Sequence, residues 1–270
     1  MDLGLSGKVA VVTGGASGIG RDICRTFVDE GTHVVVADIN DGAREGVAPI
    51  VEDLELRGGG QALYVPTDVS DRAQVEALRD AAIDRFGTVD ILVNNAAWWP
   101  TPTVFFWDED PQHWQKMIDV VLIGSLTCAQ VLGEHMRRQG SGAIVNIASD
   151  AAMLGEQKET TYSATKGGII SATRSLAVGL GPSGVRVNCV SPGRTVSEAH
   201  HEHRAAVVAE GGDAAAAYLD REKRALRYYP LRKYGTPEEV ASVVVAMASP
   251  VLTSHMSGQV VSVSGGYRVG

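Results

Sequence analysis

Three side chains in the middle of the chain could together move a proton to or from an alcohol. Tyr162 and Lys166 lie four residues apart in the stretch TTYSATKGG, and Ser149 precedes them by 13 and 17 positions. Residues four apart on a helix share a face, so the phenol and the ammonium would point the same way. A nearby lysine cation favours phenolate, and we expect it to lower the tyrosine pKa from its ordinary value of about 10 towards neutrality. A tyrosine tuned in this way could act as a general acid or base.

A glycine-rich loop near the N-terminus offers the partner that such a triplet needs. It reads TGGASGIG over residues 13–20, between an expected strand and an expected helix. Glycines permit a tight turn and a close approach of the backbone to a pyrophosphate, whose charge would then face a helix N-terminus. Taken alone, such a loop can be an ordinary turn, and Tyr-x-x-x-Lys can be the polar start of a helix. Both patterns in one chain favour a dinucleotide-dependent enzyme.

The expected second strand ends at Asp38, 18 residues after Gly20. A carboxylate at this place can accept hydrogen bonds from both hydroxyls of the adenine-side ribose and would repel a 2′-phosphate. Gly15 and Ile39 supply no cation that would bind that phosphate. The residues therefore favour NAD over NADP, by at least about tenfold. The alternative, in which Asp38 only caps the end of a strand, stays open.

Composition narrows the class of protein and the compartment. The chain has 270 residues, 44% hydrophobic and 21% charged, which fits one large α/β domain. A net charge of −8 does not suggest a nucleic-acid partner. Cys24, Cys128 and Cys189 lie far apart, which fits a reducing compartment and offers no zinc spacing. We expect no secretory signal and no membrane span, and therefore a soluble, cytoplasmic protein.

Short β-branched runs alternate with longer segments of helical periodicity. This alternation predicts right-handed crossovers and a parallel sheet covered by helices on both faces. An irregular stretch at 194–235 lies where a substrate lid would be placed, between the last two strands. The strands are expected at residues 8–13, 33–38, 62–66, 91–94, 143–148, 185–190 and 259–263.

Motifs along almost the whole chain resemble those of the short-chain dehydrogenases/reductases. Besides the loop at 13–20, they are Asp68-Val69, NNAA at 94–97, IVNIAS at 144–149, the Tyr162/Lys166 pair, Ser191-Pro192-Gly193 and SGQVVSVSGG at 257–266. The resemblance implies a single domain over 1–270, with a Rossmann-type, doubly wound, parallel seven-stranded sheet in the order 3-2-1-4-5-6-7. It also implies hydride exchange with a nicotinamide and a homotetramer.

The same resemblance assigns roles to individual residues. Ser149 would hydrogen-bond the substrate oxygen, Tyr162 would be the general acid/base, and Lys166 would hold the nicotinamide ribose and depress the tyrosine pKa. The residues expected to contact the dinucleotide are Gly14, Ser17, Gly18, Ile19, Gly20, Asp38, Ile39, Asp68, Val69, Asn95, Ala96, Tyr162, Lys166, Pro192, Gly193, Thr195 and Ser197.

Three positions depart from the family pattern. The family's fourth catalytic residue is an Asn in a DVNLxG context, whereas residues 119–124 read DVVLIG and put Val121 in its place. That Asn opens a helix kink and holds a water that supplies protons to the lysine. We predict that protons here pass through waters bound to backbone carbonyls, or that turnover is slow. Smaller departures are Ala97 for Gly and Ser264 for Asp.

All four tryptophans fall within residues 98–114. In the family this segment forms a wall of the substrate cleft, and aromatic rings there favour a cyclic or aromatic substrate. We expect Trp98 in the pocket, and Trp107 and Trp114 at a subunit interface or against the helix that begins near residue 111. The expected pocket residues are Trp98, Asp150, Met153 and Leu154.

Two charged groups outside these motifs suggest other functions. His200, His201 and His203 lie close together but lack a matching carboxylate pattern, so we predict no metal site. Basic residues between Arg221 and Lys233 are typical of a solvated helix face. The alternative is that they contact an anionic substrate such as a coenzyme A thioester.

We therefore predict an NAD-dependent secondary-alcohol dehydrogenase, reversible as a ketone reductase, for a hydrophobic, ring-bearing small molecule. The stretch IVNIASDAA and the ending VSVSGG resemble dehydrogenases of cyclic and aryl alcohols and of 2-hydroxycyclohexanecarboxyl-CoA. Oxidation of an alicyclic hydroxyacyl-CoA is thus one alternative. An NAD(H)-binding sensor or scaffold with weak catalysis is another, suggested by Val121.

Overall fold

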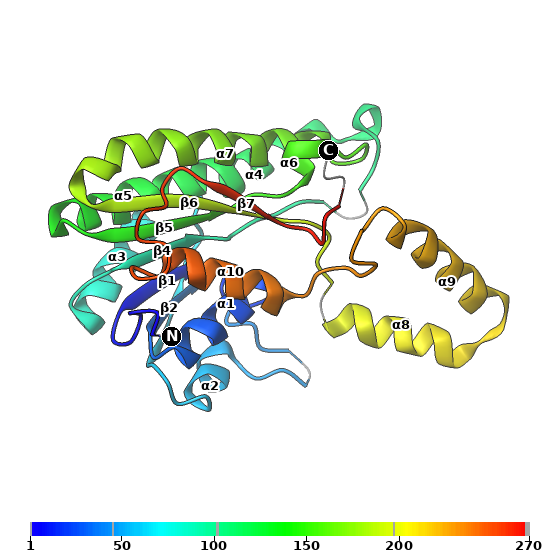
Figure 1. Ribbon diagram of the computed structural model, residues 1–270, viewed down its shortest axis with the longest axis horizontal. Helices are drawn as coiled ribbons and strands as arrows, with labels where there is room; N and C mark the ends of the chain where they lie inside the picture. The colour runs from blue at the N-terminus through cyan, green and yellow to red at the C-terminus, as the bar shows by residue number, and fades with distance from the viewer. Residues whose placement is uncertain (1, 45, 101–102, 197, 268–270) are drawn as a thin grey trace.

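Seven parallel strands form one sheet in the order β3-β2-β1-β4-β5-β6-β7, which confirms the predicted order (Figure 1). They are β1 (Val9–Thr13), β2 (His33–Asp38), β3 (Ala62–Pro66), β4 (Ile91–Asn94), β5 (Gly142–Ile147), β6 (Val185–Pro192) and β7 (Val260–Val263). The computed structural model describes residues 2–44, 46–100, 103–196 and 198–267, without the side chains of 198–203 and 214. The order of strands reverses between β1 and β4, and a site is expected at the carboxyl ends beside that reversal.

Helices cover both faces of the sheet, as the alternating pattern predicted. Their bounds are α1 (Gly18–Asp29), α2 (Ile50–Glu55), α3 (Arg72–Phe86), α4 (Pro111–Met117), α5 (Gly124–Gln139), α6 (Ala151–Leu154), α7 (Thr160–Leu180), α8 (Glu198–Glu210), α9 (Gly212–Leu226) and α10 (Pro237–Ala248). Short 3-10 turns lie at Phe106–Asp108 (η1) and Gly181–Ser183 (η3). On one face α1, α2 and α10 pack against the sheet, and on the other α3, α5 and α7 do so (Figure 1).

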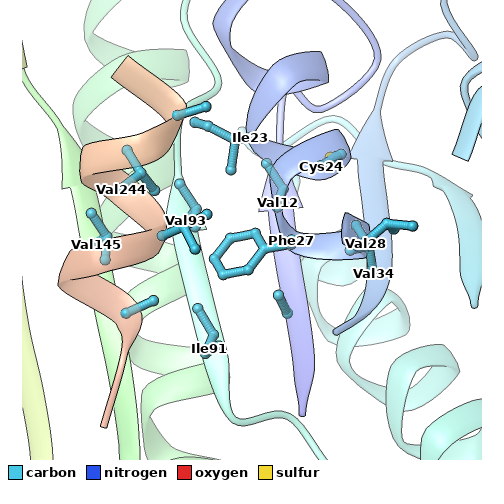
Figure 2. Close-up of a cluster of buried hydrophobic side chains, with 14 of the residues drawn as sticks. Val12, Ile23, Cys24, Phe27, Val28, Val34, Ile91, Val93, Val145 and Val244 are labelled. Carbon is cyan, nitrogen blue, oxygen red and sulfur yellow. The ribbon is translucent and has the colours of Figure 1, made fainter. Parts of the chain in front are cut away.

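Alternate residues of the central strand point into two separate apolar cores. Ala10 and Val12 of β1 join the core beneath α1 and α10, whereas Val9 and Val11 join the core beneath α3 and α5. Phe27 of α1 fills the centre of the first core, fully buried against the strands and α10 (Figure 2). Burial of such a side chain contributes about 2–3 kcal/mol. The two cores therefore fix the positions of the strands, including their carboxyl ends.

The helix before β5 contains a π-helical segment, η2 (Ile118–Ile123), between α4 and α5. A π segment inserts an extra residue per turn and marks a local widening of the helix. By length and composition, the continuous helix Pro111–Gln139 could cross a membrane, but such a match is weak evidence of a span. Here α5 packs against β4 and β5, and its buried face belongs to the second core.

The predicted lid region contains two helices, α8 and α9. They form a hairpin that projects away from the sheet (Figure 1). An ion pair from Arg204 to Glu222 joins the two helices at 2.9 Å. The chain returns to the body after α9, where the backbone N–H of Leu231 donates to the carbonyl of Gly265 at 3.2 Å.

Candidate active site

A cleft of about 1450 Å³ opens at the carboxyl ends of the strands. Residues at or just after the ends of β1 to β6 line it, from Gly14 after β1 to Thr195 after β6. Further lining residues come from the loops and from the segment beyond Thr195. Parallel strands bring their carboxyl ends to one edge of the sheet, so segments far apart in sequence meet here. The cleft is the site that the reversal between β1 and β4 predicts.

The three residues of the predicted catalytic triplet meet in this cleft. Ser149 follows β5, and Tyr162 and Lys166 lie one turn apart on α7. Ser149 forms a side-chain hydrogen bond with the phenol of Tyr162. The Lys166 ammonium lies 5.9 Å from the centre of the Tyr162 ring and donates to the carbonyl oxygen of Ile147 at 2.6 Å. A substrate oxygen could therefore meet two hydroxyls beside a buried cation.

The acid–base properties of the triplet differ from the sequence prediction. Burial, with a smaller contribution from the charge of Glu159, raises the pKa of Tyr162 to about 12, and the hydrogen bond with Ser149 only partly opposes these two effects. Burial also lowers the pKa of Lys166 to about 8. The predicted lowering of the tyrosine pKa is thus wrong for the chain alone. The lysine hydrogen-bonds the Ile147 carbonyl rather than the phenol, and the largest cause of the tyrosine shift is desolvation.

The glycine-rich loop has the backbone geometry that a pyrophosphate requires. Gly14 and Gly18 have φ of +62° and +52°, and a Cβ at Gly20 would lie 2.0 Å from the Gly14 carbonyl oxygen. The Asn95 side chain donates to the carbonyls of Thr13 and Gly14 at 3.0 and 2.9 Å and clamps the loop to the end of β4. Helix α1 begins at Gly18, so its N-terminus faces the cleft. These residues fit a dinucleotide.

The end of β2 presents the carboxylate predicted to meet the ribose. One Asp38 oxygen accepts from the Ala16 backbone N–H at 3.0 Å, and the residue lines the cleft with Ile39, which is 72% exposed. Asp68 and Val69, two of the predicted dinucleotide contacts, also line the cleft. The remaining predicted contacts Ser17, Ile19 and Ala96 also line it.

Residues after β6 form the opposite end of the dinucleotide site. Pro192, Gly193 and Thr195 line the cleft, and the Thr195 hydroxyl donates to the Gly193 carbonyl at 3.2 Å. A Cβ at Gly193 would lie 2.8 Å from the Cβ of Ser264, so Ser264 packs directly against this turn. The predicted contact Ser197 lies outside the described residues.

The aromatic segment after β4 forms a wall beside the catalytic tyrosine. Trp98 lines the cleft as predicted, with the Lys116 ammonium 4.3 Å from its ring centre. The sequence prediction did not place Trp99 in the pocket. Its ring nevertheless contacts the predicted catalytic tyrosine, with its centre 5.7 Å from that of Tyr162. The sequence feature that could have pointed to Trp99 was its position next to Trp98. Spacing alone could not show which of the two rings contacts Tyr162 on α7.

The other two tryptophans pack against neighbouring rings. Trp107 stacks on Phe105 at 5.0 Å and is 78% exposed. Trp114 of α4 stacks on Phe106 at 5.7 Å and also lines the cleft. The indole N–H of Trp114 and the hydroxyl of Thr161 both donate to one oxygen of Glu109, at 2.8 and 2.6 Å. Glu109 thus ties the aromatic wall to the residue before Tyr162.

Comparison with known proteins agrees with this geometry. The family model described as Enoyl-(Acyl carrier protein) reductase matches residues 14–268. Cis-4-hydroxycyclohexanecarboxylate dehydrogenase of Sinomonas cyclohexanicum is 36% identical over 260 residues, which cover 96% of each chain. The short chain dehydrogenase/reductase astE of Aspergillus oryzae is 35% identical over 263 residues, covering 97% of this chain and 95% of astE. The crystal structure of levodione reductase has a TM-score of 0.82 at 28% identity and covers 97% of this chain and 98% of its own.

The chain is a short-chain dehydrogenase/reductase. The resemblance predicted from its motifs is confirmed. As a member of this family, the protein is an oxidoreductase that acts on alcohols or ketones.

The wall opposite the tryptophans of this dehydrogenase differs from the prediction. Met153 and Leu154 do not belong to the described lining of the cleft, because α6 ends at Leu154 and leaves Met153 47% exposed. Asp150 does reach the cleft, but both its oxygens accept from the Ser262 hydroxyl, at 3.0 and 2.8 Å. The residues that line this side instead are Glu156, Gln157, Lys158, Glu159 and Tyr267.

Four tyrosines near the base of the α8–α9 hairpin were missed by the sequence prediction. Tyr228, Tyr229, Tyr234 and Tyr267 all line the cleft. The ring centres of Tyr229 and Tyr267 lie 4.6 Å apart, and the Tyr267 hydroxyl donates to Glu156 at 2.7 Å. Their only sequence signal was that three of them fall in the predicted lid. The end of the chain carries the fourth to the same place.

The family's missing asparagine is replaced by a buried apolar side chain. Val121 lies within the π segment η2, is fully buried and packs in a small core with Ile169 and Cys189, against Trp98 and Tyr162. Its carbonyl oxygen accepts from the Ser125 hydroxyl at 2.7 Å. The helix therefore keeps an irregular segment at this position without an amide side chain.

The charged groups outside the motifs do not extend the site. The side chains of His200, His201 and His203 fall outside the described residues. Within the described part of the chain, no group of three His, Cys, Asp or Glu residues could hold a metal. The described basic residues between Arg221 and Lys233 do not line the cleft. Two of them pair with acids, Arg224 with Asp220 and Lys233 with Glu239, as on a solvated surface.

Proposed function

We propose that this dehydrogenase interconverts a hydrophobic, ring-bearing secondary alcohol and its ketone, with NAD as the cofactor. The observation that carries the proposal is the Trp99 ring beside Tyr162, at 5.7 Å, in a cleft that also contains Ser149 and Lys166. A flat aromatic wall next to the proton donor favours a cyclic skeleton whose carbinol carbon lies against that wall. The names of two relatives, cis-4-hydroxycyclohexanecarboxylate dehydrogenase and levodione reductase, support an alcohol or ketone substrate.

In this proposal Ser149, Tyr162 and Lys166 each have a separate role in the reaction. When bound, the dinucleotide would supply the hydride acceptor for oxidation and the hydride donor for reduction. The Ser149 hydroxyl holds the substrate oxygen. In oxidation Tyr162, as the phenolate, takes the hydroxyl proton as the carbinol C–H bond breaks and the carbonyl forms. In reduction the neutral Tyr162 phenol gives its proton to the substrate oxygen, and the Lys166 cation, buried one turn away, favours the phenolate that remains.

Cofactor preference rests on the end of β2. The Asp38 carboxylate lines the cleft, and its one hydrogen bond among the described residues is accepted from the Ala16 backbone N–H. It can therefore accept ribose hydroxyls and repel a 2′-phosphate. We further propose that the segment 194–235 acts as the lid of the substrate site, because its base contributes tyrosines to the cleft. A homotetramer, a cytoplasmic location and the absence of nucleic-acid or membrane partners stay predictions.

An anionic substrate such as a hydroxyacyl-CoA is the weaker alternative. The basic stretch that suggested it does not line the described cleft, although Arg194 and Lys158 do. The Arg194 guanidinium lies 5.0 Å from the Tyr234 ring centre, and the Lys158 ammonium 4.7 Å from that of Phe105. These cations suit a carboxylate on a small ring substrate as well as a thioester carrier.

The test is a panel of cyclic alcohols, their acyl-CoA counterparts and acyclic controls, assayed with NAD and with NADP. We expect reduction of NAD with cyclic secondary alcohols and a Michaelis constant for NADP at least about tenfold higher than for NAD. Tyr162→Phe should lower turnover at least about 100-fold. Ser242→Ala removes an exposed hydroxyl on α10, outside both the described lining of the cleft and the proposed lid; it is the control and should retain full activity.

Three outcomes would contradict the proposal. Turnover confined to thioesters would favour the acyl-CoA alternative. Binding of NADH without turnover of any alcohol would indicate a sensor. A clear preference for NADP would refute the role given to Asp38.

A further inference from the structure

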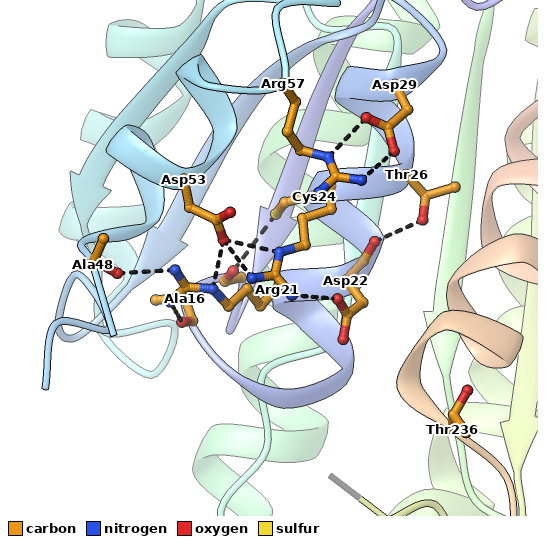
Figure 3. Close-up of polar contacts among 12 residues, drawn as sticks. Ala16, Arg21, Asp22, Cys24, Thr26, Asp29, Ala48, Asp53, Arg57 and Thr236 are labelled. Atoms are coloured by element: carbon orange, nitrogen blue, oxygen red, sulfur yellow. Dashed lines mark hydrogen bonds and ion pairs between the residues drawn. The ribbon is translucent and has the colours of Figure 1, made fainter. Parts of the chain in front are cut away.

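The first residue after the glycine-rich loop joins three separate segments of the chain. Arg21 lies in the first turn of α1 and is only 8% exposed. Its guanidinium donates to the Asp53 carboxylate on α2 at 2.8 Å, to the Ala48 carbonyl at 2.9 Å and to the Ala16 carbonyl at 3.4 Å (Figure 3). One side chain therefore connects the loop, α2 and the segment that precedes α2.

The carboxylate that receives Arg21 is itself held by a second arginine. Arg25, one turn further along α1, donates to Asp53 at 2.9 Å and to Asp22 at 2.9 Å. Burial favours the neutral form of Asp53, but the hydrogen bonds from Arg25 and Arg21 outweigh it and lower the Asp53 pKa. Asp53 is thus ionised at neutral pH, and the orientation of Arg21 is fixed by charge as well as by geometry.

Ala16 of the glycine-rich loop connects Arg21 to Asp38, the carboxylate predicted to bind the ribose. Ala16 accepts from Arg21 through its carbonyl oxygen and donates to Asp38 through its N–H, at 3.0 Å. The segment after Asp38 packs against the same Ala16 carbonyl and Arg21 guanidinium. A Cβ at Gly42 would lie 2.3 Å from the Ala16 carbonyl oxygen and 3.2 Å from the Arg21 guanidinium. A shift of Ala16 would therefore move both the loop and the carboxylate at the end of β2.

We propose that Arg21 and Asp53 are positioning residues of the dinucleotide site, which hold Ala16 and, through it, the Asp38 carboxylate. The proposal rests on the NAD preference proposed above. A buried ion pair seldom adds much stability, because desolvation of both charges offsets their attraction. Rigid placement of a hydrogen-bonding group, by contrast, raises affinity for the ligand it meets. Neither residue contacts the described catalytic triplet, so the chemical step should not depend on them.

The experiment compares Arg21→Met with Arg57→Met. Arg57 also joins α1 to the region of α2, through two hydrogen bonds to Asp29 at 2.7 and 2.6 Å, but its side-chain hydrogen bonds to the described residues do not reach the loop (Figure 3). NADH affinity is measured by fluorescence, and steady-state kinetics are run with NAD, NADP and the best alcohol. For Arg21→Met we expect NADH affinity to fall about tenfold and the NAD-to-NADP preference to fall at least about threefold.

The constants that report the chemical step and alcohol binding should not change with NADH affinity. With saturating NAD, kcat and the KM for the alcohol are expected to stay within about twofold of the parent for Arg21→Met, and all constants to do so for Arg57→Met. Arg21→Lys keeps the charge but cannot reach three acceptors with a planar fork, so an intermediate loss of NADH affinity is expected. If Arg21→Met does not fold, Arg21→Lys and Asp53→Asn carry the same test.

The outcomes separate this inference from the proposed function. If the Arg21 variants lose thermal stability while NADH affinity and the NAD-to-NADP preference stay unchanged, the residues are merely structural and the inference is wrong. Asp38→Ala tests the cofactor site itself. If Asp38→Ala abolishes the preference and Arg21→Lys leaves it intact, only the inference about Arg21 fails. If Asp38→Ala leaves the preference unchanged, the proposed NAD site fails with it.

Discussion

Replacement of Lys166 by methionine should stabilise the protein at pH 7 while it removes most of the activity. The Lys166 side chain is buried, and its one side-chain hydrogen bond among the described residues goes to the carbonyl of Ile147, at 2.6 Å. The ion pairs among the described residues do not include it. A charge in such a place is unfavourable for folding, and the proposed function supplies the reason to retain it, as a cation beside the Tyr162 phenolate.

The expected magnitude follows from the lysine pKa. Burial lowers that pKa from 10.5 to about 8, a difference that corresponds to about 3 kcal/mol of unfavourable charge burial. Methionine has a similar length and removes this penalty, but it leaves the Ile147 carbonyl without a donor, which costs about 1–2 kcal/mol. The net gain in the free energy of unfolding is then about 1–2 kcal/mol. For a domain of this size, that raises Tm by about 2–8 °C.

The gain should depend on pH in a defined direction. Below about pH 8 the lysine is protonated in both the folded and the unfolded parent, so the full penalty is present. Between about 8 and 10.5 the unfolded parent binds more protons than the folded one, so parent stability rises with pH. The advantage of Lys166→Met should therefore shrink over this window. It should vanish at about pH 9–10, where the remaining penalty equals the lost hydrogen bond.

Urea unfolding, followed by tryptophan fluorescence at pH 7 and pH 9.5, measures this difference. Lys223→Met, at an exposed position of α9, is the matched control and should leave stability within about 0.5 kcal/mol at both pH values. A variant less stable than the parent at pH 7, or one with the same advantage at both pH values, would refute the reasoning. Either result would mean that Lys166 is not a desolvated cation in the unliganded fold.

Two further substitutions test the substrate side of the cleft. Val121→Asn introduces an amide into a fully buried apolar site and should lower the free energy of unfolding by about 1–3 kcal/mol. If proton supply limits ketone reduction, the same variant should raise kcat for reduction most at high pH, where protons are scarce, and an unchanged rate and pH profile would show that the position is inessential. Trp99→Ala should raise the KM for ring-bearing alcohols by about tenfold and leave that for small acyclic alcohols within twofold, with exposed Trp107→Ala as the control.

The sheet could be predicted from the sequence because its strands are short and nearly uniformly apolar. A strand buried on both faces favours apolar residues at nearly every position, as in Ile91–Asn94, where all four residues are buried and only Asn94 is polar. The intervening helical segments then require parallel crossovers of one hand. The boundaries differed by at most a few residues, as at β6, which continues to Pro192 rather than ending at residue 190.

Contacts across the cleft could not be predicted in the same way. Motif spacing brought Ser149, Tyr162 and Lys166 together because Ser149 directly follows β5 and the other two residues lie on α7. Loops obey no such period, so the choice between Trp98 and Trp99 as the ring nearest Tyr162 had no basis in spacing. Electrostatics also depend on tertiary burial. The raised pKa of Tyr162 comes first from desolvation, which four residues of local sequence do not reveal.

The substitution at Val121 separates two functions that the family asparagine combines. If an amide side chain were needed to break the regular helix, a valine should restore an unbroken α-helix through this point. The π segment Ile118–Ile123 persists instead, with the Val121 side chain buried in the core beneath Tyr162 and its carbonyl bonded to the Ser125 hydroxyl. The irregular backbone is therefore a property of how the helix packs, since that packing is intact without the amide. What the valine removes is the polar side chain alone, so the prediction stays that protons reach Lys166 through waters bound to backbone carbonyls, or that turnover is slow.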